Sequence, residues 1–412
     1  MLAIAVCAQV DLIASASTDK TIRLWRQESG RELLLYPSYT CIQVLTDHLG
    51  GRQFEDSSLS LWICSLVWRS GDQLLLYAGD SEGVITIYKP DEAASEAFQF
   101  RMDRKNDIVH RLTVNRLLLV TQENFVFSIS FDQHLKGLDA TDGTELVSIR
   151  NLNRCNFTTM RWDSNHHELI AADELGFLGI WNVYHEKPLH WGPLFTEPKK
   201  VIDLCILEEE NRLIVCTETI VNVYDIVRGQ RTHDIQGHEG PIIALYGQEP
   251  YQIQKLHSDE NPRFISCSLD NTLRVWDLNE GSTKLLMKAG DREEITCMCY
   301  LEVSNLIATG LENGGILLWN PEVGAKYPIE DHAHPRHTNT VTALCAAVFK
   351  DIEYLLSTGY DAHVCIYEIC DRAWALRQVA KGAAGIPVIP AFRNSFYVLQ
   401  HKKFTKPEVK GT

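Results

Sequence analysis

The sequence has few of the features that would place it in a membrane or in the secretory pathway. No window of about 18 apolar residues occurs in its 412 positions, so no helix is expected to span a membrane. The first 17 residues are largely apolar, but they lack a basic start and Asp11 interrupts them, which argues against a signal peptide. The twelve cysteines include no CxxC pair, and most lie in apolar, strand-like runs. We therefore expect free thiols in a reducing, cytoplasmic setting.

The motifs of common enzyme classes are also missing. The sequence contains no GxSxG, no HExxH, no phosphate-binding loop and no GxGxxG that follows a strand. Three histidines lie close together at His332, His334 and His337. A zinc site would need further ligands and a pocket, so a connecting loop is the preferred interpretation. The sequence predicts neither catalysis nor a cofactor nor a bound metal.

The charge balance limits the choice of partner. The net charge is −15, which repels nucleic acid and attracts Lys- or Arg-rich protein segments. The same charge is also common on well-solvated surfaces. A basic tail is predicted for residues 401–412, which include Lys402, Lys403, Lys406 and Lys410.

A short stretch, Ile265 to Asp277, shows what the sequence contains in place of these features. Apolar and polar residues alternate, Asp270-Asn271 forms a turn signal, and a second strand ends at Trp276-Asp277. Similar stretches recur along the chain, at intervals of 43 to 52 residues after a first interval of 63. Their strand-ending aromatics are Trp25, Tyr88, Phe131, Trp181, Tyr224, Trp276, Trp319 and Tyr367.

Each repeat has the composition of about four short strands, which predicts an all-β fold. Four-stranded antiparallel blades repeated at this period form a β-propeller, predicted here for residues 1–400. The predicted units are 1–40, 57–105, 106–155, 156–197, 198–237, 238–290, 291–336 and 337–380. Eight blades are favoured, with the run Ile386 to Leu399 completing the first blade. Two alternatives stay open: seven blades with a partial one, or a piece of a longer protein.

The units resemble WD repeats over nearly the whole chain. In that family a His before the first strand, a Ser or Thr in the second, an Asp in the turn and the Trp ending the third form a hydrogen-bonded network. The resemblance assigns these structural roles to His238, Ser266, Asp270 and Trp276 in the sixth unit, and to His337, Ser357, Asp361 and Tyr367 in the eighth. A tyrosine hydroxyl is not expected to copy an indole N–H.

The other units match the pattern less well. The first has Ser15, Asp19 and Trp25, while the seventh has Thr309 and Trp319, with Asp291 where His is expected. The second to fifth units are assigned by their spacing and strand pattern. Their divergence is compatible with a structural subunit of a larger assembly.

The resemblance implies a scaffold for protein–protein interaction and predicts that it is a subunit of a larger intracellular assembly. The alternatives are a reader of short basic peptides at the channel mouth and a cytoskeletal or ciliary component. In the family, partners often dock where the residue before the turn Asp points outward. These positions are Thr18, Leu269, Glu312 and Tyr360, and two longer loops, 46–60 and 248–263, add candidate surface.

Overall fold

The computed structural model describes most of the chain, in two compact units. The described residues are 3–17, 20–27, 39–46, 62–92, 99–106, 109–184, 188–194, 199–248, 262–290, 293–329, 337–349, 352–361, 363–370 and 397–401. A six-sheet unit comprises residues 2–26 and 40–288. A two-sheet unit comprises residues 289–412, together with residue 1 and residues 27–39.

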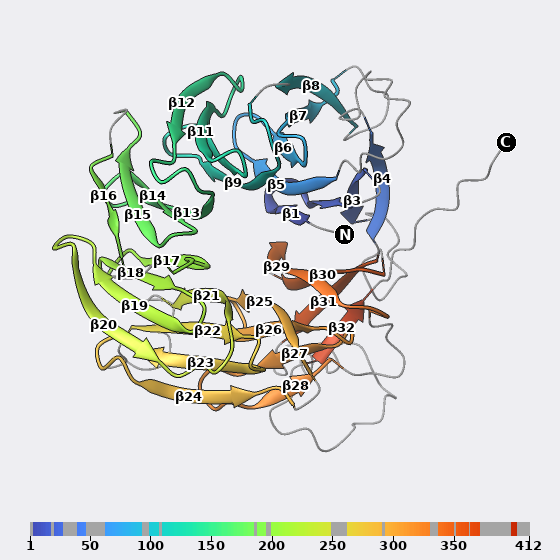
Figure 1. The fold of residues 1–412 in the computed structure, drawn as a ribbon. Helices are drawn as coiled ribbons and strands as arrows, with labels where there is room; N and C mark the ends of the chain where they lie inside the picture. The colour runs from blue at the N-terminus through green and yellow to red at the C-terminus, as the bar shows by residue number, and fades with distance from the viewer. Residues whose placement is uncertain are drawn as a thin grey trace, which may run out of the picture. The chain divides into compact units, whose positions relative to one another are not determined.

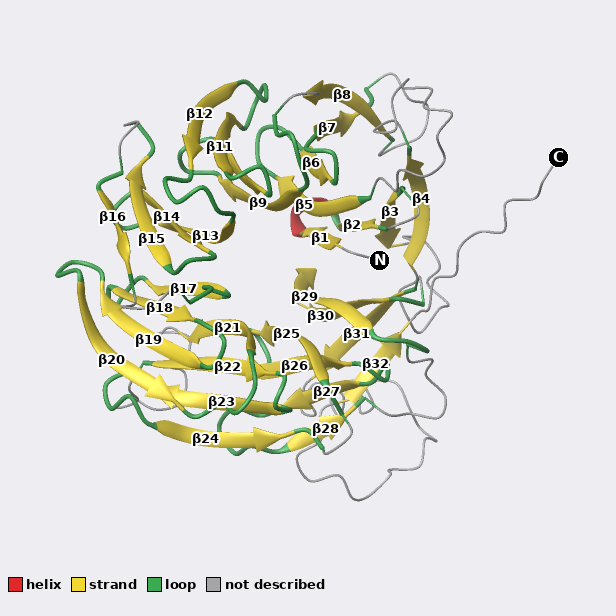
Figure 2. Cartoon of the chain, viewed as in Figure 1, coloured by secondary structure: helices red, strands yellow, loops and turns green. Residues whose placement is uncertain are grey.

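The described residues form eight four-stranded antiparallel sheets, numbered here in chain order. Each sheet contains four strands that follow one another in sequence, as Figure 1 shows by label and colour. The only helical turn in the described part is a short 3-10 turn, Ala8–Val10, drawn in red in Figure 2. The predicted fold class, a β-propeller with eight four-stranded blades, is confirmed. No helix in the described ranges has the length and apolar character needed to cross a membrane.

The six-sheet unit contains β1 to β24. Sheets 1 and 2 consist of β1 (Ala3–Cys7), β2 (Leu12–Ala16), β3 (Ile22–Gln27), β4 (Tyr39–Leu45), β5 (Ile63–Arg69), β6 (Leu75–Asp80), β7 (Ile85–Pro90) and β8 (Phe100–Asn106). Sheets 3 and 4 consist of β9 (Val114–Val120), β10 (Phe125–Ser130), β11 (His134–Asp139), β12 (Glu145–Arg150), β13 (Phe157–Asp163), β14 (Glu168–Asp173), β15 (Phe177–Asn182) and β16 (His190–Pro193). Sheets 5 and 6 consist of β17 (Asp203–Leu207), β18 (Arg212–Cys216), β19 (Ile220–Asp225), β20 (Gln230–Gln236), β21 (Ile242–Gln248), β22 (Arg263–Ser268), β23 (Thr272–Asp277) and β24 (Thr283–Lys288).

The two-sheet unit contains sheets 7 and 8. Their strands are β25 (Ile295–Leu301), β26 (Leu306–Leu311), β27 (Ile316–Trp319), β28 (Lys326–Pro328), β29 (Val341–Phe349), β30 (Ile352–Gly359), β31 (Val364–Cys370) and β32 (Tyr397–His401).

Tight turns join the strands, and the residue types at these turns explain why the strands end there. Asn124, Asn211 and Asn305 each take a left-handed conformation in the turn between the first and second strands of their sheets. Asparagine tolerates this conformation better than most residues. Gly83 also has a positive φ, of 89°, and a Cβ there would collide with the backbone of His110. The turn of sheet 2 therefore packs directly against the segment that enters sheet 3.

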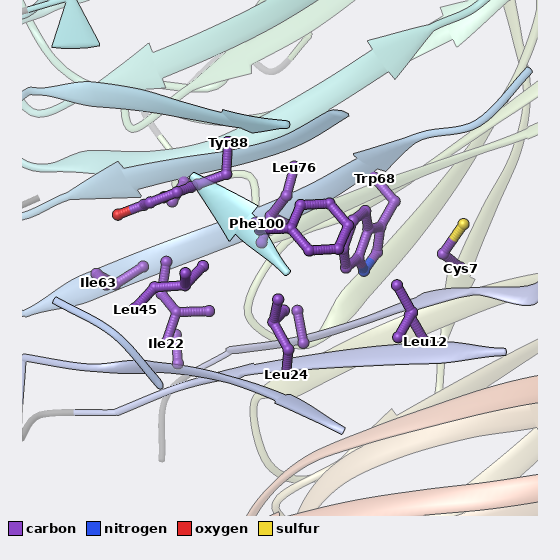
Figure 3. Close-up of a cluster of buried hydrophobic side chains, with 13 residues drawn as sticks. Cys7, Leu12, Ile22, Leu24, Leu45, Ile63, Trp68, Leu76, Tyr88 and Phe100 are labelled. Carbon is purple, nitrogen blue, oxygen red and sulfur yellow. The ribbon is translucent and has the colours of Figure 1, made fainter. Parts of the chain in front are cut away.

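The hydrophobic core lies between neighbouring sheets. Figure 3 shows the cluster between sheets 1 and 2, where Leu12 and Leu24 lie opposite Trp68 and Phe100. In this cluster Trp68 packs edge-on against Phe100, with ring centroids 5.6 Å apart. The second strand of each sheet is buried on both faces, so its sequence is apolar with small polar interruptions rather than alternating.

The fourth strands of sheets 1 and 8 differ from the prediction. The fourth strand of sheet 1 is β4, which extends beyond the predicted boundary at residue 40. Sheet 1 is complete without the run Ile386 to Leu399, so its predicted role in the first blade is wrong. Part of that run falls in β32, which pairs with β31 in sheet 8 and lies beyond the predicted boundary at residue 380. The predicted basic tail lies almost wholly outside the described residues.

The third unit was aligned on the wrong residue. Phe131 does not end a strand; it lies in the turn between β10 and β11, and 45% of its surface is exposed. The third strand of this sheet instead ends at Leu138-Asp139, with Leu138 fully buried. An aliphatic residue therefore occupies the place that other sheets give to an aromatic, and aligning on aromatics shifted the assigned strands.

Candidate functional site

The four network residues of sheet 6 lie within hydrogen-bonding distance of one another. His238 precedes the first strand, Ser266 lies in β22, Asp270 in the turn and Trp276 in β23. The His238 ring contacts Asp270 through Nδ1 at 3.0 Å and the Ser266 hydroxyl through Nε2 at 2.7 Å. The Trp276 indole N–H donates to the same hydroxyl at 2.7 Å. We call such a set, which joins the entering segment to the second strand and the turn, a lock.

The carboxylate of Asp270 also holds the backbone on both sides of it. Its Oδ2 accepts the Glu239 N–H at 2.9 Å, and its Oδ1 accepts the Thr272 N–H at 2.9 Å. Burial alone would raise the pKa of Asp270, but hydrogen bonds from Thr272, Glu239 and His238 outweigh it and lower the pKa. Burial lowers the pKa of His238, partly opposed by Asp270. The lock therefore favours a neutral imidazole beside an ionised carboxylate.

Sheet 8 contains a second lock. His337 contacts Asp361 through Nδ1 at 2.9 Å and Ser357 through Nε2 at 2.8 Å. Burial alone would raise the pKa of Asp361, but hydrogen bonds from the Thr338 N–H and His337 outweigh it and lower this pKa well below its usual range. The hydroxyl of Tyr367 forms a hydrogen bond with Ser357. The expectation that tyrosine does not replace the indole N–H was wrong, because the phenol reaches the same serine.

Sheets 1 and 7 show only part of the network. The Trp25 indole donates to Ser15 at 2.9 Å, and the Trp319 indole donates to Thr309 at the same distance. Asp19 and Asp291 lie outside the described residues. In both sheets the tryptophan of the third strand thus donates a hydrogen bond to a hydroxyl of the second strand.

Sheet 3 contains a complete histidine lock that the sequence analysis missed. His110 contacts Asp132 through Nδ1 at 3.0 Å and Ser128 through Nε2 at 2.8 Å. The spacing of Ser128 and Asp132 equals that of Ser266 and Asp270, with four positions separating each pair. A search for this Ser-x3-Asp spacing that did not require the aromatic would have revealed the lock of sheet 3.

Sheets 2 and 4 use a different arrangement. Asp80 and Asp173 precede their aromatics by eight positions rather than six, and both are almost fully buried. Asp173 Oδ1 accepts the N–H groups of Leu175 and Phe177 at 2.9 Å, and its Oδ2 accepts two asparagine side chains, Asn151 and Asn153. Alanine replaces the lock serine at Ala171, and within the described residues the Trp181 indole N–H has no partner.

The predicted docking positions lie where each turn meets the entering segment. Leu269 and Tyr360 expose 47% and 62% of their surfaces, and Glu312 is also exposed. The backbone N–H of Leu269 donates to Pro241 O at 2.9 Å, which holds the backbone at this position. Phe131 occupies the equivalent position in sheet 3 and was not predicted. Thr18, most of residues 46–60, and residues 249–261 of the second long loop lie outside the described residues.

A continuous series of hydrogen bonds connects these turns and entering segments across sheets 2 to 4. The His110 N–H donates to Gly83 O at 3.0 Å, and the Phe131 N–H donates to Thr113 O at 3.1 Å. The Asn151 N–H then donates to Gln133 O at 2.9 Å, and the Asn151 side chain reaches Asp173. In an antiparallel sheet the entering segment and the second turn lie at the same strand ends. The four most apolar exposed side chains of these segments are Leu112, Phe131, Leu152 and Leu175.

We call Leu112, Phe131, Leu152 and Leu175 the loop surface. Their exposed fractions are 52%, 45%, 66% and 39%. Single exposed apolar residues are common, but four on consecutive, hydrogen-bonded segments form a larger apolar area. The loop surface is therefore the strongest candidate binding feature of the six-sheet unit.

Metal and thiol chemistry receive no support from the described part of the chain. No group of three or more His, Cys, Asp or Glu side chains that could hold a metal occurs there. His332 and His334 lie outside it, whereas His337 belongs to the sheet 8 lock. Burial raises the pKa of Cys299 to about 12 and that of Cys345 to about 11. Such thiols stay protonated and are poor nucleophiles.

The chain is similar to known proteins with WD repeats. The family model described as "WD domain, G-beta repeat" matches residues 2–26 and 229–277. The second range contains the complete lock of sheet 6. Human apoptotic protease-activating factor 1 is 24% identical over 208 residues, which cover 48% of this chain and 15% of that protein. The guanine nucleotide-binding protein subunit beta of Zea mays is 22% identical over 183 residues, 42% of this chain and 45% of that protein. The chain thus spans less than half the length of these curated relatives.

Solved structures agree on the fold. The C-terminal WD40 domain of Sif2 aligns over 90% of this chain and 96% of that domain, with a TM-score of 0.67 and 12% identity. The computationally designed protein Ika8 aligns over 89% of this chain and 96% of its own, with a TM-score of 0.62 and 20% identity. At these identities the similarity concerns the fold alone.

Proposed function

Since the chain belongs to the WD-repeat β-propeller proteins, we propose that it is a non-enzymatic platform that binds another protein through the loop surface of sheets 2 to 4. WD-repeat propellers generally mediate protein–protein interactions, which gives the coarse function. The finer proposal rests on one observation: Leu112, Phe131, Leu152 and Leu175 are exposed together on segments that hydrogen bonds hold in place.

The lock of sheet 3 and the buried aspartate of sheet 4 give this surface a physical advantage in binding. His110 and Asp132 fix the segment that carries Leu112 to the turn that carries Phe131. Asp173 holds the turn of Leu175 and, through Asn151 and Asn153, the segment of Leu152. A partner that docks here orders few additional backbone residues, so less binding free energy is lost to entropy.

The partner is expected to present an apolar patch with a polar rim. Exposed Phe and Leu side chains suit the centre of an interface, where water is excluded. We propose that the platform lies inside the cell, because the eleven cysteines whose side chains the structure describes are all free thiols. Imaging of the tagged protein, compared with a secreted control, tests this location.

The experiment is a comparison of two matched double variants. Leu112→Ser with Phe131→Ser removes the centre of the loop surface. Val227→Ser with Leu286→Ser removes two apolar side chains that are 68% and 44% exposed but lie outside it. Each variant is tagged, expressed in cells of the organism that naturally makes the protein, and purified together with its partners. Mass spectrometry then quantifies these partners. Recovery of a stoichiometric partner should fall at least about tenfold for the first variant, as expected when two central contacts are lost.

Equal melting temperatures of the two variants establish that both are folded. If the loop variant keeps every partner that the control variant keeps, the loop surface is not the binding site. If both variants keep the same partners, the next candidate binding positions are Leu269 in sheet 6, and Tyr360 and Glu312 in the two-sheet unit.

A further inference from the structure

The first strands of the six-sheet unit contain very few charged side chains. Figure 1 shows these strands, which lie next to one another in the order β1, β5, β9, β13, β17 and β21. They are rich in aliphatic, small polar and sulfur-containing residues. Their charged residues are Arg69, Arg116, Arg161, Asp163 and Asp203. Three of these converge, although they come from three different sheets.

Arg116 of β9, Arg161 of β13 and Asp203 of β17 meet at one carboxylate oxygen. Arg161 Nη2 lies 2.8 Å from Asp203 Oδ1, and Arg116 Nη1 lies 3.4 Å from the same atom. The Thr159 hydroxyl bridges the group: it accepts from Arg116 Nη1 at 3.1 Å and donates to Asp203 Oδ1 at 3.2 Å. The cluster thus ties sheets 3, 4 and 5 together at their first strands.

The cluster has a surplus of positive charge. Asp203 supplies one negative charge for two guanidinium groups. Its short contact with Arg161 pairs that charge with Arg161. The charge of Arg116 therefore has no full counterpart among the described residues, in a chain whose net charge is −15. An uncompensated cation beside apolar strands attracts an anion more strongly than a cation in open water does.

The geometry of Arg116 leaves a usable set of donors. All its hydrogen bonds to described residues come from Nη1. A guanidinium has five N–H donors, so the edge formed by Nε and Nη2 stays free. The side chain is 41% exposed, whereas that of Asp203 is 10% exposed. Two parallel N–H groups on one edge match the two oxygens of a carboxylate.

We propose that the free edge of Arg116 is an oxyanion-binding site, and that its ligand is an Asp or Glu side chain of a bound protein. The oxyanion chemistry follows from the cluster itself, while the choice of a protein side chain rests on the proposed function. Arg116 follows Leu112 by four residues, which span at most about 13 Å of extended chain, so an acidic side chain of a partner docked on the loop surface can reach it. This site disfavours the alternative of a basic-peptide reader in this unit.

The test uses protein labelled with ¹⁵N in its arginine side chains. Three probes are titrated separately: a blocked Gly-Ser-Glu-Ser-Gly peptide, the same peptide with Gln for Glu, and inorganic phosphate. The Nε signal of Arg116 is assigned by its loss in Arg116→Lys. The Glu peptide should shift this signal in a saturable manner, and the Gln peptide should not.

Two variants complete the design. Arg116→Lys keeps the charge but loses the planar pair of donors, so binding of the Glu peptide, measured by competition, should weaken about tenfold without a change in melting. Arg150→Lys alters an exposed arginine on β12 and should leave the Glu-peptide affinity unchanged.

Three results would overturn the proposal. The first is the absence of a saturable shift at Arg116. The second is an equal shift of the Arg150 signal, which reveals unspecific attraction. The third is a response to phosphate alone, which would exclude the carboxylate ligand. None of these results affects the loop-surface experiment, which can succeed or fail independently.

Discussion

Sheets 3 and 6 hold their turns with a histidine lock, whereas sheets 2 and 4 hold the equivalent turns with a buried aspartate. In the lock, the imidazole carries the connection from the entering segment to the second strand, as His238 does between Asp270 and Ser266. In sheet 4 the aspartate, Asp173, lies two positions earlier relative to the tryptophan. Its carboxylate connects the turn to the entering segment directly. Two different sets of polar residues therefore produce the same four-stranded architecture.

The comparison separates what the fold requires from what the family pattern contains. Both arrangements satisfy the backbone N–H groups of the turn and anchor the entering segment. Buried polar groups must find partners, but the partners need not be the same residues. A sheet without the His, Ser and Trp pattern therefore still has hydrogen bonds that hold its turn and its entering segment.

The largest effect is expected from Asp173→Ala in sheet 4. The substitution leaves two backbone N–H groups and two asparagine side chains without their acceptor, at a position with no exposed surface. We expect the free energy of unfolding to fall by about 3 kcal/mol or more. Chemical denaturation of the purified protein measures this change. Asp173→Asn keeps one acceptor oxygen and should lose less; equal losses would show that the carboxylate charge alone matters.

The second effect concerns the lock itself. Asp270→Ala removes the acceptor for Glu239 N–H, Thr272 and His238, and we expect a loss of about 2 kcal/mol. The loss should be smaller than that of Asp173→Ala, because the side chain of Asp270 is 10% exposed and water can replace part of its bonds. Glu239→Ala, which removes a neighbouring exposed carboxylate, serves as the control. Unchanged denaturation of Asp270→Ala would mean that the lock contributes nothing to stability.

Acid should distinguish the two kinds of sheet as well. Burial lowers the pKa of His238 below its ordinary value of 6.5, so the unfolded chain takes up a proton before the folded chain does. The stability contributed by the neutral ring is present above pH 6.5 and is lost as the pH falls through the lowered pKa. The loss amounts to at most about 1.4 kcal/mol per pH unit for one proton. The lowered pKa of Asp270 adds a further loss below its ordinary value of 3.8.

Unfolding measured between pH 7 and 5 checks this prediction with His238→Gln. The glutamine variant is expected to be less stable at pH 7 but to lose less stability on acidification than the unmodified protein. Parallel pH profiles would contradict a titrating histidine in the lock.

The comparison also explains how far the sequence could lead. The repeat spacing and the alternating strands predicted eight four-stranded sheets, because strand packing depends on general apolar patterns rather than on specific residues. The lock of sheet 3 escaped detection because Leu138 replaces the aromatic on which the units were aligned. The aspartates of sheets 2 and 4 escaped because a buried carboxylate looks like an ordinary turn residue in sequence. Contacts between sheets, such as Arg116 with Asp203, join residues 87 positions apart, and no local pattern indicates them.

The smallest effect is expected from the loss of a single indole N–H, that of Trp276 or that of Trp181. Trp276 donates its indole N–H to Ser266 in sheet 6, whereas in sheet 4 Ala171 leaves the Trp181 indole without a described partner. Replacement of either tryptophan by phenylalanine removes similar volume from a buried site, but only Trp276→Phe breaks a hydrogen bond. We expect Trp276→Phe to cost about 1 kcal/mol more than Trp181→Phe in chemical denaturation. Equal costs, or a larger cost for Trp181→Phe, would show that ring packing rather than the shared serine gives this position its value.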